Sequence, residues 1–310
     1  MKKKELLAVA AVLETANNVL LSGEHKDSQG LAEMFVQCQD AAIQIGTSLE
    51  AMGEQYAAIV NLLEDYCENI YRMSISLTDE KTCRSLAEKV SRQLTELQNK
   101  IQYEVPEDKK EVVFLPYKAS MWDSLESVWK AADADKDCNT YVIPIPYYDK
   151  NPDGSFGQMH YEGDRYPDYV PITSYKEYNF EKNRPDVIFI HNPYDNCNRV
   201  TSVPPAFYSK KLTNYTETLV YIPYFLLDEI RPDDDEEIER MRHFCTMPGV
   251  MNADKVVVQS ENMKQVYIKV LMDVIDDHSE AAKKYLNSKI LGLGSPKIDK
   301  VLEARKEDYV

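Results

Sequence analysis

The chain has 310 residues, with 36 Lys or Arg against 52 Asp or Glu, which gives a formal net charge of −16. A surface this acidic repels nucleic-acid phosphates and anionic lipid headgroups, so we expect no nucleic-acid partner and at most peripheral membrane contact. A hydrophobic fraction of 44% excludes wholesale disorder, and no apolar run approaches the ~20 residues of a membrane span.

The six cysteines are widely spaced and contain no C-x-x-C pair, which excludes a zinc ribbon and a thioredoxin-type redox pair. Free thiols in a reducing cytoplasm suit a chain that is long enough to bury a core. Lys2–Lys4 and the apolar run Leu6–Leu13 weakly imitate a signal peptide, but the run is short and an amphipathic first helix is favoured. We expect a cytoplasmic protein, with a peripheral position at the inner face of the membrane left open.

Proline divides the chain into two regions. Residues 1–105 contain none of the 15 prolines, whereas residues 141–225 contain ten of them and 13 of the 21 tyrosines. This change of composition places a boundary in the polar linker 105–110, which carries the helix-stopping Pro106.

The first region, 1–105, is predicted to be helical. Apolar residues three or four apart predict a helix over 6–20, broken at Ser22–Glu24, and another that starts near Thr78–Asp79. The run between them, 31–70, predicts one long helix or two helices joined near Gly46 or Gly53. These helices form either a bundle or coiled-coil region that dimerises, or an intramolecular bundle that merely packs.

The second region, 106–310, alternates apolar strands with helices, which predicts a parallel α/β sheet covered on both faces. Residues 149–178 are predicted to form a long loop or small flap, and 111–115 and 186–190 to be adjacent central strands. Such sheets bind ligands at the carboxyl ends of their strands. The predicted strands are 111–115, 141–146, 186–190, 217–222, 255–259 and 289–293, and the predicted helices are 124–132 and 262–277.

The turn after the first strand offers groups that suit an anion. Tyr117 supplies a hydroxyl and Lys118 an ammonium, and Ser120 or Asp123 is the predicted N-cap of the following helix. The alternative is an ordinary capped helix with Trp122 packed beneath it.

The turn after the third strand contains His191 beside Asn192, Tyr194 and Asp195. An imidazole at a strand exit could act as a general base, although a lone histidine is usually structural. After the fourth strand, Tyr224 could stack on a sugar or base, or simply pack. The residues expected to line one cleft are Tyr117, Lys118, His191, Asn192 and Tyr224.

Known cofactor and metal motifs are missing from the sequence. There is no P-loop, G-x-G-x-x-G, G-x-S-x-G or H-E-x-x-H pattern, and the calcium-loop opening at 133–137 has Cys138 in place of glycine and Pro144 in place of glutamate. We predict no cofactor and no metal.

Five stretches carry a family resemblance. They are 113–129 (VFLPYKASMWDSLESVW), 141–148 (YVIPIPYY), 186–195 (DVIFIHNPYD), 219–225 (LVYIPYF) and 294–299 (GSPKID). Together they resemble the N-terminal half of CDP-glycerol glycerophosphotransferases of the teichoic-acid polymerase-like group, and the last stretch is similar to that family's G-S/N/Y-P-R-x-D turn. The resemblance covers residues 111–300 and not the helical region.

The resemblance implies a GT-B architecture, in which two Rossmann-like domains face a cleft. Residues 106–310 would be the acceptor-side domain, with the donor domain absent, and the partners would be a nucleotide-activated, CDP-linked donor and a polymer acceptor of teichoic-acid or capsule type. The family's Trp-His-Gly-Thr motif is missing, since the comparable strand ends in Ile222–Phe225, so a sugar or polyol phosphate is as open as glycerol phosphate.

In this interpretation His191 is the base or phosphate contact, and Lys118 with the helix near Ser120 binds an anion. The alternative is a non-catalytic glycan- or nucleotide-binding module. In both, a homo-oligomer through residues 1–105 is left open.

Overall fold

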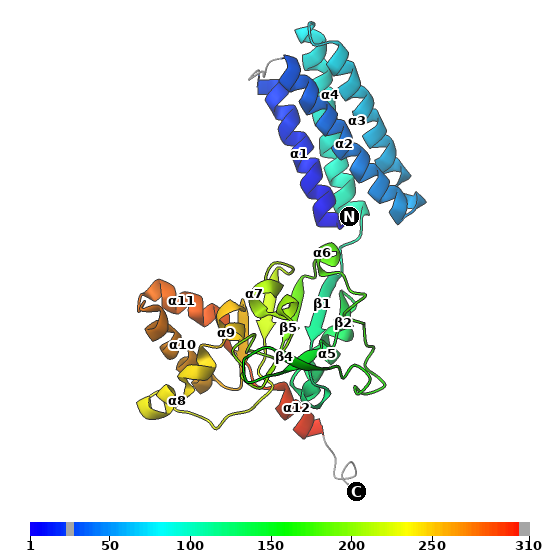
Figure 1. Ribbon diagram of the computed structural model, residues 1–310. Helices are drawn as coiled ribbons and strands as arrows, with labels where there is room; N and C mark the ends of the chain where they lie inside the picture. The colour runs from blue at the N-terminus through cyan, green and yellow to red at the C-terminus, as the bar shows by residue number, and fades with distance from the viewer. Residues whose placement is uncertain (23–27, 304–310) are drawn as a thin grey trace. The chain divides into compact units, whose positions relative to one another are not determined.

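The computed structural model describes residues 1–22 and 28–303, and the chain divides into two compact units, Met1–Asp108 and Lys109–Val310 (Figure 1). Each unit has its own buried apolar clusters, one in the first unit and two in the second. We describe each unit by itself.

The first unit is a bundle of antiparallel helices (Figure 1). Apolar residues three or four apart, such as Leu6, Ala10 and Leu13, point inward and are buried. The helices are α1 (Lys3–Ser22), α2 (Ser28–Met52), α3 (Ala57–Ile75) and α4 (Glu80–Glu104), with a short 3-10 turn at Glu54–Tyr56.

The breaks between these helices follow from local chemistry. The sequence placed a joint in the run 31–70 near Gly46 or Gly53, and in the structure the helices are joined at Gly53. Its φ of 136° is a conformation that L side chains rarely adopt. Gly46 lies inside α2. Asp79 caps α4, because its side chain accepts a hydrogen bond from the Thr82 amide. The predicted break at Ser22–Glu24 lies partly outside the described residues.

Among the described residues, α1 is long and apolar enough, by length and composition alone, to cross a membrane. This corrects the sequence prediction that no apolar run approaches the length of a membrane span, because α1 has 20 residues. The core helix of a soluble protein and a signal sequence near the N-terminus pass the same test. Leu6, Ala10 and Leu13 of α1 are buried in the bundle, but only 22% of the apolar window is buried.

The second unit is built on a six-stranded sheet with every strand parallel to its neighbours, which confirms the predicted α/β class and is compatible with a Rossmann-like fold. As predicted, the strands at 111–115 and 186–190 are neighbours, with Val113 opposite Ile188. In the order of the sheet, the strands are β2 (Cys138–Val142), β1 (Lys110–Leu115), β5 (Val187–Ile190), β7 (Thr218–Tyr221), β8 (Lys255–Val258) and β9 (Ile290–Gly292).

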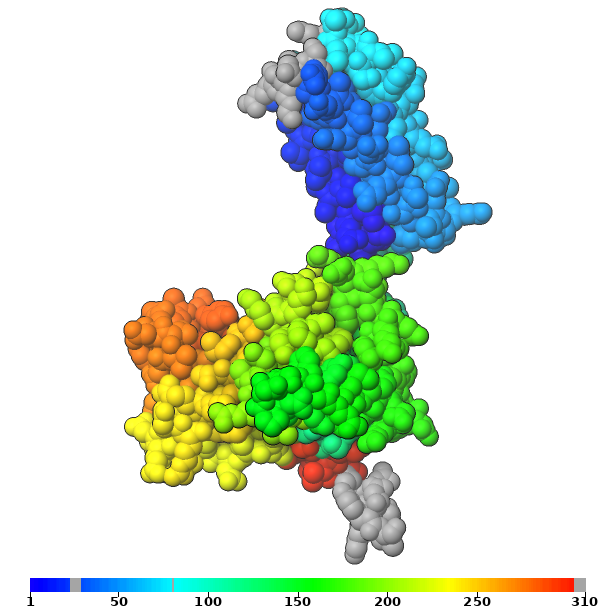
Figure 2. Space-filling view, viewed as in Figure 1, coloured from blue at the N-terminus to red at the C-terminus, as the bar shows by residue number. Residues whose placement is uncertain are grey.

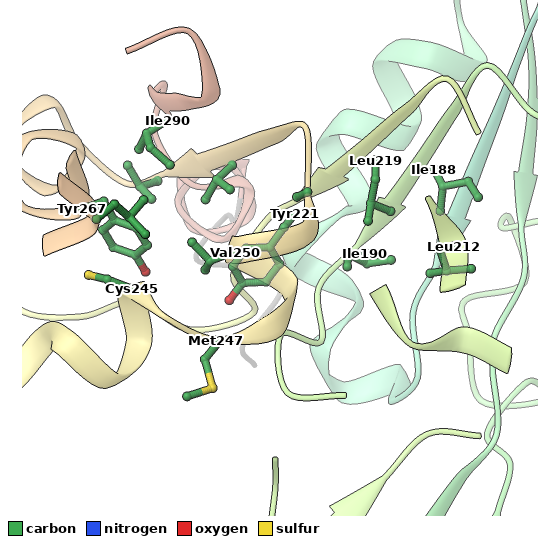
Figure 3. Close-up of a cluster of buried hydrophobic side chains, with 14 of the residues drawn as sticks. Ile188, Ile190, Leu212, Leu219, Tyr221, Cys245, Met247, Val250, Tyr267 and Ile290 are labelled. Carbon is green, nitrogen blue, oxygen red and sulfur yellow. The ribbon is translucent and has the colours of Figure 1, made fainter. Parts of the chain in front are cut away.

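Successive residues of each strand face opposite sides of the sheet, and both sides are covered. On one side, Ile188 and Tyr221 join a cluster with Leu212 and Val250, part of which Figure 3 shows. The helices on this side are α7 (Ser209–Leu212), α8 (Asp235–Cys245), α9 (Pro248–Asn252), α10 (Glu261–Ile275) and α11 (Glu280–Lys289).

On the other side, Phe114 and Phe189 stack on each other and join a cluster that includes Trp122 and Trp129. The two indole rings lie 5.8 Å apart between centroids. The helices on this side are the 3-10 helix η2 (Ala119–Ser124), α5 (Glu126–Asp133) and α12 (Pro296–Glu303), which packs on the first two.

The start of the flap predicted at 149–178 forms a hairpin of β3 and β4, which pairs with β6 from a later part of the chain in a small antiparallel sheet of order β4–β3–β6. Its hairpin lies at the surface of the unit, in the green segment of Figure 2. The strands are β3 (Tyr147–Lys150), β4 (Phe156–His160) and β6 (Thr201–Ser202); the remaining short helices are α6 (Phe180–Asn183) and the 3-10 turn η3 (Pro205–Phe207).

Candidate functional site

The strand order fixes where this fold presents its ligand-binding crevice. After β1 the chain crosses to β2 on one side and then to β5 on the other, so the direction of winding reverses between β1 and β5. Ligands of doubly wound sheets bind outside the carboxyl ends of the strands at this reversal. The residues there are Pro116–Lys118 after β1 and His191–Tyr194 after β5.

His191 lies in this position, but its side chain is 0% exposed. Its Nε2 accepts a hydrogen bond from the Tyr117 amide at 3.1 Å, so the proton of the neutral ring is on Nδ1. Nδ1 lies 2.9 Å from the Ser124 Oγ, which itself donates to the Met121 carbonyl. Burial lowers the pKa of His191 to about 3. The ring is therefore a neutral link between the β1 turn, β5 and η2.

This geometry corrects the general base predicted at His191. A general base must reach the proton that it abstracts, directly or through one water. Both nitrogens of His191 are occupied within the protein and the ring has no exposed surface. The structure gives His191 the structural role that the sequence left as the alternative.

Tyr117 is at the centre of an aromatic cluster. Its buried ring meets Tyr147, His191 and Tyr224 edge to face, with centroid distances of 5.6, 5.3 and 6.3 Å. Burial raises the pKa of Tyr117 and of Tyr147 to about 12, so both phenols are neutral at pH 7. The Tyr224 hydroxyl donates to that of Tyr194 at 3.4 Å.

Lys118 extends over this cluster. Its Nζ lies 4.9 Å from the ring centroid of Tyr147 and 5.5 Å from that of Tyr117, within the range of a cation–π contact. Among the described residues, no hydrogen bond or ion pair engages this ammonium. Glu162, close by, accepts instead from the Ala119 amide and the Tyr147 hydroxyl. Lys118 therefore offers a positive charge to an anion at the carboxyl edge of the sheet.

Ser120 and Asp123 are not the helix caps that the sequence predicted. Ser120 is exposed within η2, and the residues that cap η2 and α5, Lys118 and Leu125, make no side-chain capping bond. The Asp123 carboxylate pairs with the Lys297 ammonium of α12 at 2.5 Å. Asp123 thus anchors α12 and does not prepare a helix terminus for an anion.

Asn192 and Asp195 also serve the local fold. Asn192 Oδ1 accepts from the Tyr194 amide at 3.3 Å. Asp195 is buried with a φ of 46°, and its carboxylate accepts from the amide and hydroxyl of Ser209 at 2.8 and 2.7 Å. Burial raises the pKa of Asp195, and the Ser209 hydrogen bonds oppose that rise. Asp195 holds the start of α7 in place.

The predicted cleft is therefore realised only in part. Tyr117, His191 and Tyr224 come together from three strand ends, but they fill the crevice by packing on one another. Beyond them, at the ends of β7–β9, a cavity of about 20 Å³ lined by Pro223, Gln259 and Ser295 has room for about one water. What remains accessible is the outer rim, with Lys118 on it.

The sequence reasoning missed two residues near this rim. Lys297 could have been found, because it occupies the arginine position of the turn motif at 294–299 and Asp299 of the same motif accepts from Ser127. Glu162 lies in the flap, where nothing in the sequence distinguishes it from its neighbours. Its partners are set by how the flap folds over the β1 turn.

Within 1–22 and 28–303, no group of three or more His, Cys, Asp or Glu side chains is arranged to hold a metal ion. Comparison of the chain with protein-family models, with curated proteins and with solved structures found no match.

Proposed function

We propose that the α/β unit is the acceptor-side half of a GT-B transferase, which moves a glycerophosphate, polyol-phosphate or sugar group from a nucleotide-activated donor to a cell-envelope polymer. The stretches that resemble the glycerophosphotransferases cover parts of four sheet strands, β1, β2, β5 and β7, with the segments that follow them, and the start of α12. The observation that carries the proposal is the Lys118 ammonium above the tyrosine rings at this edge, which makes no hydrogen bond or ion pair within residues 1–22 and 28–303.

The role of this site is to bind and orient the acceptor. Lys118 would hold a phosphate of the polymer, and a hydrogen bond to a charged group contributes about 1.5–3 kcal/mol. The neutral phenols of Tyr147 and Tyr224 would flank the polyol carbons between phosphates. Because His191 is buried, this unit contributes positioning and not proton transfer.

A GT-B enzyme needs two Rossmann-like sheets facing one cleft, and residues 109–303 contribute one. The proposal therefore assigns the acceptor to this unit and the activated donor to a second one. The burial of His191 is also the observation that favours the other candidate, a non-catalytic binding module for a phosphorylated glycan.

Titration of the full chain with a short oligomer of glycerol phosphate tests the site. We expect Lys118→Ala to weaken binding about tenfold or more, since a charge-assisted contact is lost. Lys118→Arg should keep most of the affinity, and Lys136→Ala, at an exposed lysine elsewhere in the unit, should keep all of it. Equal affinities for the wild type and Lys118→Ala would remove Lys118 from the site.

A transfer assay separates the two candidates. Release of CMP from CDP-glycerol that depends on the oligomer would support the transferase. Oligomer binding without release, in the presence of a donor-binding partner domain, would support the binding module.

A further inference from the structure

A second candidate surface lies on the bundle, along the outer side of α2 and α3. There the two helices enclose a groove of about 540 Å³ whose floor is apolar. Ile43 and Gly46 contribute from α2, and Val60, Leu63 and Tyr71 from α3. Ile43 is 59% exposed and Tyr71 is 53% exposed, so large apolar side chains face solvent here.

The apolar strip continues past one end of the groove. Gln39 donates from Nε2 to the Cys67 carbonyl at 3.1 Å, which fixes how the antiparallel helices are aligned. With this alignment Val36, two turns before Ile43, and Ile75, one turn after Tyr71, lie at the same end. Both are more than half exposed. Large exposed apolar side chains gathered along one groove mark a binding surface.

The groove is also strongly acidic. Glu50, Glu64 and Glu68 line it, and all three are exposed. Residues 28–75 contain seven carboxylates and one basic residue, Arg72, which pairs with Glu68 at 2.9 Å. By contrast, α4 carries five basic and four acidic residues, so the negative charge is concentrated on the side formed by α2 and α3.

We propose that the α2/α3 groove binds a basic amphipathic helix of a partner protein. Apolar side chains spaced three, four and seven residues apart on such a helix would fill the floor, and its Lys and Arg residues would meet Glu50, Glu64 and Glu68. A second copy docked through the same face would bring two acidic rims together, and an anionic membrane or nucleic acid would be repelled. Charge therefore selects the occupant.

The test uses the full chain and labelled synthetic peptides of about 18 residues, which make five helical turns. One peptide is a Leu/Lys amphipathic helix, the second replaces every Lys by Glu, and the third has the Leu/Lys composition in a scrambled, non-amphipathic order. We expect the first alone to bind, with an affinity that falls as salt is added. Equal binding of the scrambled peptide would overturn the proposal.

Variants locate the binding. The double variant Glu50→Lys/Glu64→Lys and the single variant Ile43→Ser should each lower the affinity for the Leu/Lys peptide about tenfold. All three positions are exposed, so we expect the fold to be kept. The matched controls are Glu88→Lys/Glu96→Lys on α4 and Val12→Ser on α1, which should bind as the wild type does. An equal loss of affinity in the control variants would show that the peptide is held by the general charge of the chain, and would overturn the proposal that it binds in the groove.

Sedimentation of the chain without peptide tests the competing occupant. We expect Ile43→Ser to leave the mass in solution unchanged. A dimer that Ile43→Ser dissolves would assign the groove to a second copy of the chain and overturn the proposal.

Discussion

The buried imidazole of His191 makes the stability of the α/β unit sensitive to mild acid. Its pKa is about 3 in the folded chain, against an ordinary value of 6.5. Below pH 6.5 the unfolded chain takes up a proton that the folded chain excludes, so unfolding is favoured. The stabilisation that comes from the neutral, buried His191 is complete above pH 6.5. Below pH 6.5 it falls by roughly 1.4 kcal/mol per pH unit, and it is gone near pH 3.

Between pH 7 and about pH 5, we expect His191 to cost the α/β unit about 2 kcal/mol of unfolding free energy. His191→Asn removes the titrating group and keeps an amide donor for Ser124, so this variant should lose less on acidification. Denaturant titrations of both proteins at several pH values measure the difference. Parallel pH profiles would show that His191 titrates normally.

The location of His191 could be predicted from the sequence, but not its burial. An apolar run followed by a polar turn places this residue at a strand end, which the structure confirms. The ring lies on the same side of the sheet as Phe189, where the Ser124 hydroxyl is hydrogen-bonded to it. That closure depends on the turn after β1, 67 residues earlier, and no local pattern encodes it.

At the scale of elements, predictions held where local chemistry decides. Gly53 and Asp79 end and begin helices through their own conformations and hydrogen bonds, and apolar runs located β1, β5, β7, β8 and β9. The strand predicted at 141–146 is instead β2, Cys138–Val142. Beyond it, the amides of Ile143 and Ile145 still donate to the carbonyls of Phe114 and Pro116, so the chain follows β1 past the end of the regular strand.

Elements that depend on tertiary contacts could not be predicted from the sequence. The hairpin of β3 and β4 is short and lies in a segment rich in Pro and Gly, so its pairing with β6 gives no periodic pattern. The helix predicted at 124–132 is observed as α5 (Glu126–Asp133), but the 3-10 helix η2 that precedes it was not predicted. Asp123 of η2 and Ser127 of α5 bind α12. The partner residues lie more than 170 positions away in the chain.

The cap of α4 gives a prediction at this scale. Asp79 accepts from the amide of Thr82 at 3.1 Å and from its hydroxyl at 2.6 Å, and these bonds lower the pKa of its carboxyl. Asp79→Ala should therefore lower the stability of the bundle, because the first amides of α4 lose their acceptor, whereas Asp79→Asn should cost much less. Thermal unfolding followed by circular dichroism measures both, and equal losses would show that the cap oxygen is unimportant.

At the scale of the whole molecule, the buried clusters divide as the units do. The cluster from Leu6 to Val105 belongs to the bundle, and the clusters from Val112 to Ile290 belong to the α/β unit. A separate core is the condition for a unit to unfold by itself.

We therefore expect two thermal transitions for the full chain. Calorimetry should show that Asp79→Ala lowers the melting temperature of one transition only, and that His191→Asn lowers only the other. One cooperative transition that both substitutions shift together would show that the units unfold as a single body.

The tryptophan pair makes these units optically distinct. Trp122 and Trp129 are the two tryptophans of the chain, and both are buried beneath the sheet of the α/β unit. Tryptophan fluorescence therefore reports on that unit alone, and the emission maximum should shift to longer wavelength when the unit unfolds and exposes the indole rings to water. Melting of the bundle, or binding of a helix between α2 and α3, should leave the emission spectrum unchanged. The full-length chain therefore carries an intrinsic reporter of the α/β unit alone.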